Sequence, residues 1–170
     1  MNALRRNLVA LVSLLAVIGT LGAAAALAGD ARPSGHHASP RPDHELHGTW
    51  LTTVQLSDAP PGVPTSFGAL DTFLPGGGLV VSSSAPLPST RGLAHGSWSH
   101  IGHRNFTATF TWFRFDASGQ PVGTQRVTRR MNVSRSGSSF TGTDLIEVIS
   151  PSGAVLATIH GTETGTLLPG

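Results

Sequence analysis

Asp71, Arg129 and Asp144 are the side chains best placed to do chemistry together. Each lies near the middle of a segment in which apolar and polar residues alternate, and each falls in the apolar phase. In a half-buried β-strand that phase faces the interior. A buried charge is costly unless it is paired, and two carboxylates can pair with one guanidinium. Such a group can orient the polar end of a ligand, or raise the proton affinity of one carboxylate for acid/base work.

The alternative is that one of these segments is out of register. A slip of one residue, or a β-bulge, turns the following side chains to the opposite face. In the expected strand 104–115, Phe113 and Phe115 break the alternation, which predicts a bulge or a second apolar face there. If a slip affects Asp71, Arg129 or Asp144, there is no polar site inside.

Other candidate residues are less well placed. His100 shares the interior phase, but His95 on the same segment has the opposite parity, so we expect surface histidines and not a metal site. Glu147 and Glu163, which have threonine neighbours, are expected to be exposed. The sequence has no G-x-S-x-G, phosphate-binding glycine loop or H-E-x-x-H motif. Without cysteine or lysine there is no thiol nucleophile or Schiff base. We expect no cofactor, and no motif identifies a reaction.

The elements that must position these residues are strands. The clearest is NFTATFTWFRFD, residues 105–116, where aromatic residues and Ala alternate with Thr. No segment has a helical period, and Ser-Gly pairs mark the later turns. We expect eight strands, at residues 47–56, 66–74, 78–84, 94–101, 104–115, 121–133, 139–149 and 154–167.

Eight consecutive antiparallel strands with no covering helix must stack as two sheets or close on themselves. A sandwich usually needs Greek-key crossovers, whereas the short links here favour a meander. Closure also removes the exposed strand edges. We therefore predict an all-β domain at 46–170, an eight-stranded antiparallel up-and-down barrel, with a sandwich as the alternative.

The N-terminal residues 1–28 have the pattern of a secretory signal peptide. Arg5 and Arg6 precede an apolar run and a small-residue tail that ends in Ala26-Leu27-Ala28, so cleavage before Gly29 is expected. A retained membrane anchor is the alternative. Residues 29–45 are too poor in apolar side chains to fold and are expected to be a disordered linker. Four histidines there or just after it can collect a metal ion, the alternative to a solvated tail; they are His36, His37, His44 and His47.

The charge balance argues against nucleic acid as a partner. The whole chain carries eleven basic and nine acidic residues, but two arginines belong to the expected signal peptide. The remaining chain is close to neutral and has no basic stripe with interleaved aromatic residues. We expect a secreted or cell-envelope protein without stable membrane insertion after cleavage.

Gly48-Thr49-Trp50, at the start of the first expected strand, resembles the G-x-W motif that opens the first strand of lipocalin-type (calycin) barrels. Gly96-Ser97-Trp98 repeats the pattern. The region 46–170 also resembles bacterial exported proteins of this barrel type. The resemblance implies a floor near the tryptophan and an open mouth that admits a small apolar ligand.

Two features depart from lipocalins. The stretch 165–168 lacks the arginine that usually packs over that tryptophan, and no helix follows the last strand. Because of these departures, the alternative resemblance is to a neighbouring group of eight-stranded barrels, the allene-oxide-cyclase-like barrels, whose members include enzymes.

Loop lengths predict where a pocket opens. In a meander the links alternate between the two ends, so the two longest, 57–65 and 85–94, share an end. Trp50 begins its strand at the opposite end. We expect a binding protein for a small apolar molecule; the alternatives are a cyclase or isomerase that uses an interior carboxylate, and a ligand-free structural domain. The expected ligand-binding residues are Trp50, Phe67, Asp71, Trp98, Phe110, Trp112, Arg129 and Asp144.

Overall fold

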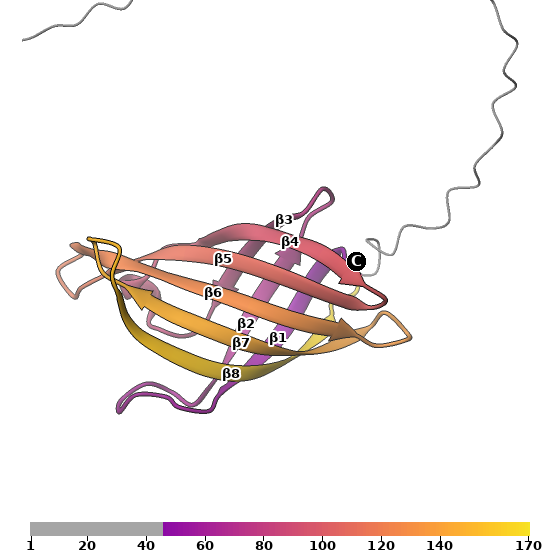
Figure 1. Cartoon of the computed structure of the whole chain (residues 1–170), viewed down its shortest axis with the longest axis horizontal. Coiled ribbons are helices and arrows are strands. Elements are labelled where there is room, and N and C mark those ends of the chain that lie inside the picture. Colours follow the sequence, from indigo (N-terminus) through magenta and orange to yellow (C-terminus); the bar gives the residue numbers. More distant parts are fainter. Residues whose placement is uncertain (1–45) are drawn as a thin grey trace, which may run out of the picture. The chain divides into compact units, whose positions relative to one another are not determined.

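The structure, a computed structural model, describes residues 46–170 (Figure 1). The predicted signal peptide and linker lie outside the described residues, as do His36, His37 and His44. Eight strands follow one another, with a short 3-10 helix, η2 (Pro88–Thr90), between β3 and β4. The strands are β1 (Gly48–Leu56), β2 (Ser66–Phe73), β3 (Gly78–Ser83), β4 (Ala94–Gly102), β5 (Asn105–Phe115), β6 (Pro121–Val133), β7 (Ser139–Ile149) and β8 (Val155–Leu167).

The strands form a closed barrel in sequence order, each antiparallel to its neighbours. Closure is made by β1 and β8, whose register runs from Trp50 opposite Leu167 to Leu56 opposite Gly161. The predicted all-β up-and-down barrel is therefore confirmed, and the sandwich alternative is wrong. Because every strand has two partners, no edge is left unpaired.

The interior phase predicted from the alternation is also confirmed. On β5, Phe106, Ala108, Phe110 and Trp112 are buried while the threonines between them are not. The expected bulge is present as a register shift after Arg114, where β5 pairs with β6. Gly123 lies opposite Arg114 and has a φ of +122°, a conformation that favours glycine.

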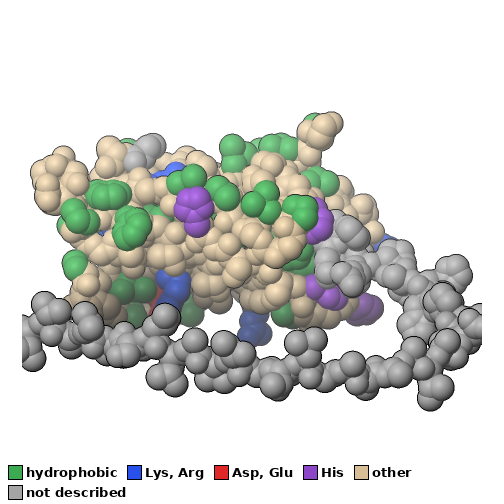
Figure 2. All heavy atoms as spheres, turned by 90° about the horizontal axis from the view of Figure 1, so that it is seen from above, with side chains coloured by type: hydrophobic (Ala, Val, Ile, Leu, Met, Phe, Trp, Pro, Cys, Tyr) green, Lys and Arg blue, Asp and Glu red, His purple; other side chains and the backbone are tan. Residues whose placement is uncertain are grey.

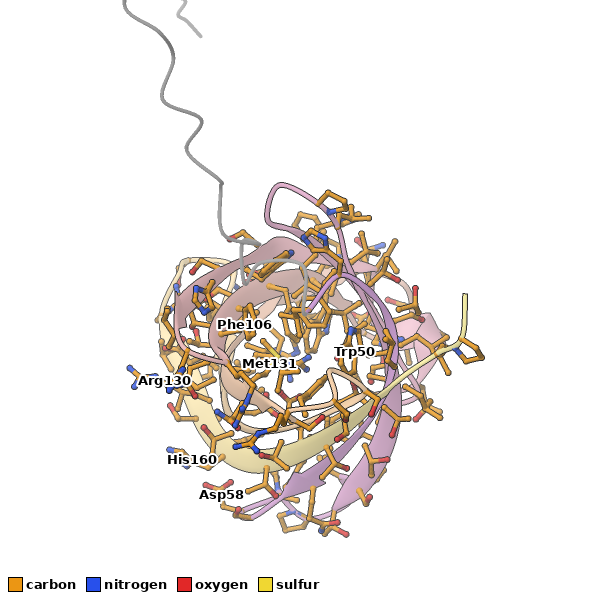
Figure 3. The ribbon with its side chains drawn as sticks, turned by 90° about the vertical axis from the view of Figure 1, so that its right-hand side faces the viewer. Trp50, Asp58, Phe106, Arg130, Met131 and His160 are labelled. Carbon is orange, nitrogen blue, oxygen red and sulfur yellow. The ribbon has the colours of Figure 1, made fainter. Side chains whose placement is uncertain are left out.

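One end of the barrel is filled with aromatic side chains. The ring centroids of Trp50 and Phe140 are 5.1 Å apart, and those of Trp98 and Phe106 are 5.9 Å apart. Gly165 on β8 makes room for this packing, because a Cβ there would lie 2.1 Å from the Phe140 ring. Figure 3 looks into the barrel from this end, with Trp50 and Phe106 directed inward. This end is closed.

Candidate functional site

A buried ionic cluster lies in the middle of the barrel. Arg129 on β6 is its centre, with Nη1 2.6 Å from Asp71 Oδ2, Nε 3.3 Å from Asp144 Oδ1, and Nη2 3.2 Å from Glu163 Oε2. The Thr52 hydroxyl donates a hydrogen bond of 2.7 Å to the same Asp71 oxygen. All five side chains are buried. The prediction that Asp71, Arg129 and Asp144 lie together inside the barrel is confirmed.

Glu163 is buried, so the exposed position predicted from its threonine neighbours is wrong. It is 2% exposed and contributes the third carboxylate. The cause is the composition of β8, where the interior positions alternate with threonines and include Gly161 and Gly165 beside Glu163. On the other strands, large apolar residues mark the positions that face the interior. On this part of β8 those positions hold glycines, so no such residues mark the inward face. The alternation with outward Thr162 and Thr164 was the available signal.

The cluster is buried and has more acid than base, and burial is the main cause of its shifted carboxyl pKa values. Burial raises the pKa of Glu163 well above its usual range and that of Asp144 above its own, although the Arg129 charge opposes both shifts. The charge of Asp71 raises both further. Burial alone would lower the pKa of Arg129, but the carboxylates of Glu163, Asp71 and Asp144 raise it, so Arg129 stays charged.

Most of the acceptor capacity in the cluster is unused. Only Asp71 Oδ2 accepts hydrogen bonds, from Arg129 and Thr52. The Asp144 and Glu163 oxygens lie within ion-pair distance of Arg129, but the angles are not those of hydrogen bonds. Asp71 Oδ1, Asp144 Oδ2 and Glu163 Oε1 have no hydrogen-bond partner within the described residues. Buried acceptors without donors are costly and often mark functional sites.

A cavity of about 620 Å³ lies on the other side of the cluster from the closed end. Its wall is mainly apolar, with Val54, Phe67, Phe110, Trp112 and Ile146 among its residues. The links 57–65 and 84–93 contribute Pro60, Val63, Pro64, Ala85 and Leu87. The cavity thus opens at the end where the two longest links meet, as the loop lengths predicted.

Five of the eight predicted ligand-binding residues line this cavity: Phe67, Phe110, Trp112, Arg129 and Asp144. The other three do not. Trp50 and Trp98 belong to the closed end, where their ring N–H groups donate to the backbone oxygens of Leu46 and Leu74. Asp71 is fully buried and does not line the cavity, but it forms an ion pair with Arg129, which does. His100 contacts Phe106 at the closed end and does not join the cluster.

The open end of the barrel carries exposed apolar side chains, and a hydrogen-bonded contact holds one of its links to β8. Leu87, Phe113 and Leu156 are among the exposed large apolar residues, and Figure 2 shows green side chains at the end where the links after β5 and β7 lie. Link 57–65 is held to β8 by Asp58, whose Oδ1 accepts the His160 backbone N–H at 2.6 Å and whose Oδ2 lies 3.0 Å from His160 Nδ1 (Figure 3).

Within residues 46–170, no three His, Asp or Glu side chains are arranged to hold a metal ion. In the same range no helix is long and apolar enough to cross a bilayer. We compared the whole chain with known proteins. No protein-family model, no curated protein and no solved structure matches it.

Proposed function

We propose that this chain is an exported, lipocalin-like barrel that binds a small, largely apolar molecule in its lumen. The observation that carries the proposal is the cavity of about 620 Å³ above the Arg129 cluster. This volume falls in the range of about 300–1,000 Å³ typical of small-molecule sites. Eight strands enclose a lumen that holds one small ligand or is filled by side chains, and this barrel is filled at one end only.

The G-x-W motif supports the lipocalin-like part of the proposal. Trp50 lies at the closed end of β1, packed against Phe140, where a lipocalin places its floor. Export rests on the signal-peptide pattern before Gly29. Sequencing the N-terminus of protein recovered from the medium or the envelope tests it: a start at Gly29 supports export, and retention of Met1 in the membrane fraction contradicts it.

A neutral apolar dye that becomes fluorescent when buried tests lumen binding. We expect one dye per barrel. Ala69 lines the cavity on β2, so Ala69→Phe should fill it and weaken dye binding at least tenfold. Leu70→Phe is the matched control, because Leu70 is the next residue and is 45% exposed on the outer face. Equal dye binding by both variants, or no binding by the parent, would contradict a lumenal site.

An enzyme of cyclase or isomerase type is the second candidate, and one observation favours it. Asp144 lines an apolar cavity, and burial raises its pKa above the usual aspartate range, a shift that favours proton transfer by a carboxyl group. Native mass spectrometry of freshly purified protein separates the candidates. A retained, chemically unchanged ligand supports binding, whereas a substrate–product mixture that depends on Asp144 supports catalysis.

A further inference from the structure

Charged side chains define the polar end of the cavity. Only three charged side chains line the cavity within the described residues: Arg114, Arg129 and Asp144. Arg114 lies at the bulge near the end of β5, towards the mouth. Arg129 and Asp144 belong to the mid-barrel cluster. The part of a ligand that lies deepest in the cavity therefore contacts Arg129 and Asp144.

Arg129 is already surrounded by acidic side chains. Its Nη1, Nε and Nη2 atoms each face a carboxylate, of Asp71, Asp144 and Glu163 respectively. One face of its guanidinium is covered by Phe110, with the central carbon 4.6 Å from the ring centroid. An anionic ligand head would have to compete with three built-in acidic side chains for one cation. Anions are therefore disfavoured at this end.

Asp144 offers what Arg129 lacks. It is 4% exposed, it lines the cavity, and its Oδ2 atom has no hydrogen-bond partner within the described residues. Its one charge contact is Arg129 Nε at 3.3 Å. A donor that approached from the cavity would satisfy an acceptor that the protein leaves open. A positively charged donor would also offset the excess of carboxylates around Arg129.

We propose that the ligand is an amphipathic amine: an apolar chain or ring system with one protonated amino group, which docks against Asp144 at the inner end of the cavity. This inference rests on the proposed lumenal binding and adds the class of ligand. The apolar wall takes the hydrocarbon part. The ammonium group supplies a donor to the open Asp144 oxygen and a positive charge beside that carboxyl group.

Amine binding is coupled to a proton. Three ionisable side chains share the cluster with Asp144: Arg129 on β6, whose Nε is 3.3 Å from Asp144 Oδ1, Asp71 on β2 and Glu163 on β8. In the empty barrel, burial and Asp71 raise the pKa of Asp144, although Arg129 opposes them. An ammonium group beside the carboxyl lowers that pKa again. Amine affinity should therefore rise with pH until the empty site has lost its proton, and binding below that pH should release protons.

The test uses three probes of equal chain length: n-octylamine, n-octanol and sodium octanoate. Each competes with the neutral dye for the parent protein at constant ionic strength. Since a charge-assisted hydrogen bond is stronger than a neutral one, we expect the amine to bind at least about tenfold more tightly than the alcohol. Octanoate should bind most weakly. Equal affinities, or tighter binding of octanoate, would overturn the inference.

Two variants locate the amino group. Asp144→Asn keeps the size of the side chain but not its charge, so the amine-to-alcohol affinity ratio should fall towards one. Glu147→Gln is the matched control, because Glu147 lies on the same strand and pairs with Arg126 on the outer face. Its ratio should equal that of the parent. A ratio that Asp144→Asn leaves unchanged contradicts docking at Asp144. Dye binding without amine preference refutes this inference alone; absence of dye binding refutes the proposed function.

Discussion

Arg129 on β6 reaches across the barrel to Asp71 on β2, with Nη1 2.6 Å from Oδ2, although the two residues are 58 positions apart in the chain. β2 and β6 lie opposite each other in the eight-strand order, four strands apart in either direction. The ion pair therefore spans the lumen. It divides the barrel into a packed half, around Trp50 and Phe140, and a hollow half lined by Phe110 and Trp112.

Replacing Arg129 tests whether this cross-lumen pairing is needed for stability. Arg129→Met leaves three buried carboxyl groups without a cation, and loss of one partner from a buried ionic group typically costs ~3–5 kcal/mol. We expect a loss of that size at neutral pH, measured by equilibrium urea denaturation.

The control for Arg129→Met is Arg126→Met on the same strand. Arg126 is 46% exposed and pairs with Glu147 at 2.8 Å on the outer face. An exposed pair of this kind contributes ~0–1 kcal/mol. Similar losses in the two variants would show that the buried cluster contributes no more than a surface ion pair.

The raised pKa of Glu163 predicts a dependence of stability on pH. Burial, opposed by Arg129, keeps a proton on the folded Glu163 carboxyl in a pH range where the unfolded chain has released it. The contribution of Glu163 to the free energy of unfolding should therefore be fully present below the ordinary glutamate pKa of ~4.3 and be lost as the pH rises through the raised value of the folded state.

Glu163→Gln removes that titration. The variant should show a flatter dependence of unfolding free energy on pH, and its stability relative to the parent should improve towards alkaline pH. Urea denaturation at several pH values measures both slopes, with Glu147→Gln as the control on the outer face. Parallel curves for Glu163→Gln and the parent would mean that Glu163 does not hold an extra proton in the folded state.

The sequence predicted the barrel and part of the candidate site because strand alternation and loop length can both be read from short stretches of the chain. Alternation on β2, β6 and β7 placed Asp71, Arg129 and Asp144 inside, and loop lengths located the mouth. Glu163 was missed because small residues occupy its phase on β8. Trp50 and Trp98 were assigned to the ligand site because they lie in the inward, aromatic-bearing phase of their strands. Whether an inward aromatic residue lines a cavity or fills the core depends on how side-chain volumes combine across strands, which no single strand reveals.

Gly165 shows how the closed end depends on such volumes. A Cβ at this position would lie 2.1 Å from Phe140 Cε1, so Gly165→Ala must displace the ring that packs on Trp50. Overpacking of this kind typically costs ~1–3 kcal/mol. Gly68→Ala is the control, because its Cβ would be 3.8 Å from the nearest atom, the Thr52 oxygen. Thermal unfolding should separate the two variants, and equal melting temperatures would contradict tight packing at Gly165.

The contact between Asp58 and His160 predicts how the mouth is controlled. The link 57–65 supplies Pro60 and Val63 to the cavity wall, and Asp58 ties that link to β8 through both carboxylate oxygens. Asp58→Ala should release the link, so that backbone amides in 57–65 exchange hydrogen faster and the apolar dye enters and leaves faster. Its equilibrium affinity should change little, because Asp58 does not line the cavity.

Acid should act in the same direction as Asp58→Ala. Hydrogen bonding from the His160 side chain lowers the pKa of Asp58, so the contact is complete above the ordinary aspartate pKa and is lost as the pH falls through the lowered value. Asp116→Ala is the matched control: Asp116 Oδ1 accepts 2.9 Å hydrogen bonds from Ser118 and Gln120 within its own link. Faster exchange there should stay within 116–120 and leave dye kinetics unchanged. If Asp58→Ala leaves both the exchange of 57–65 and the dye kinetics as in the parent, the contact does not restrain the mouth.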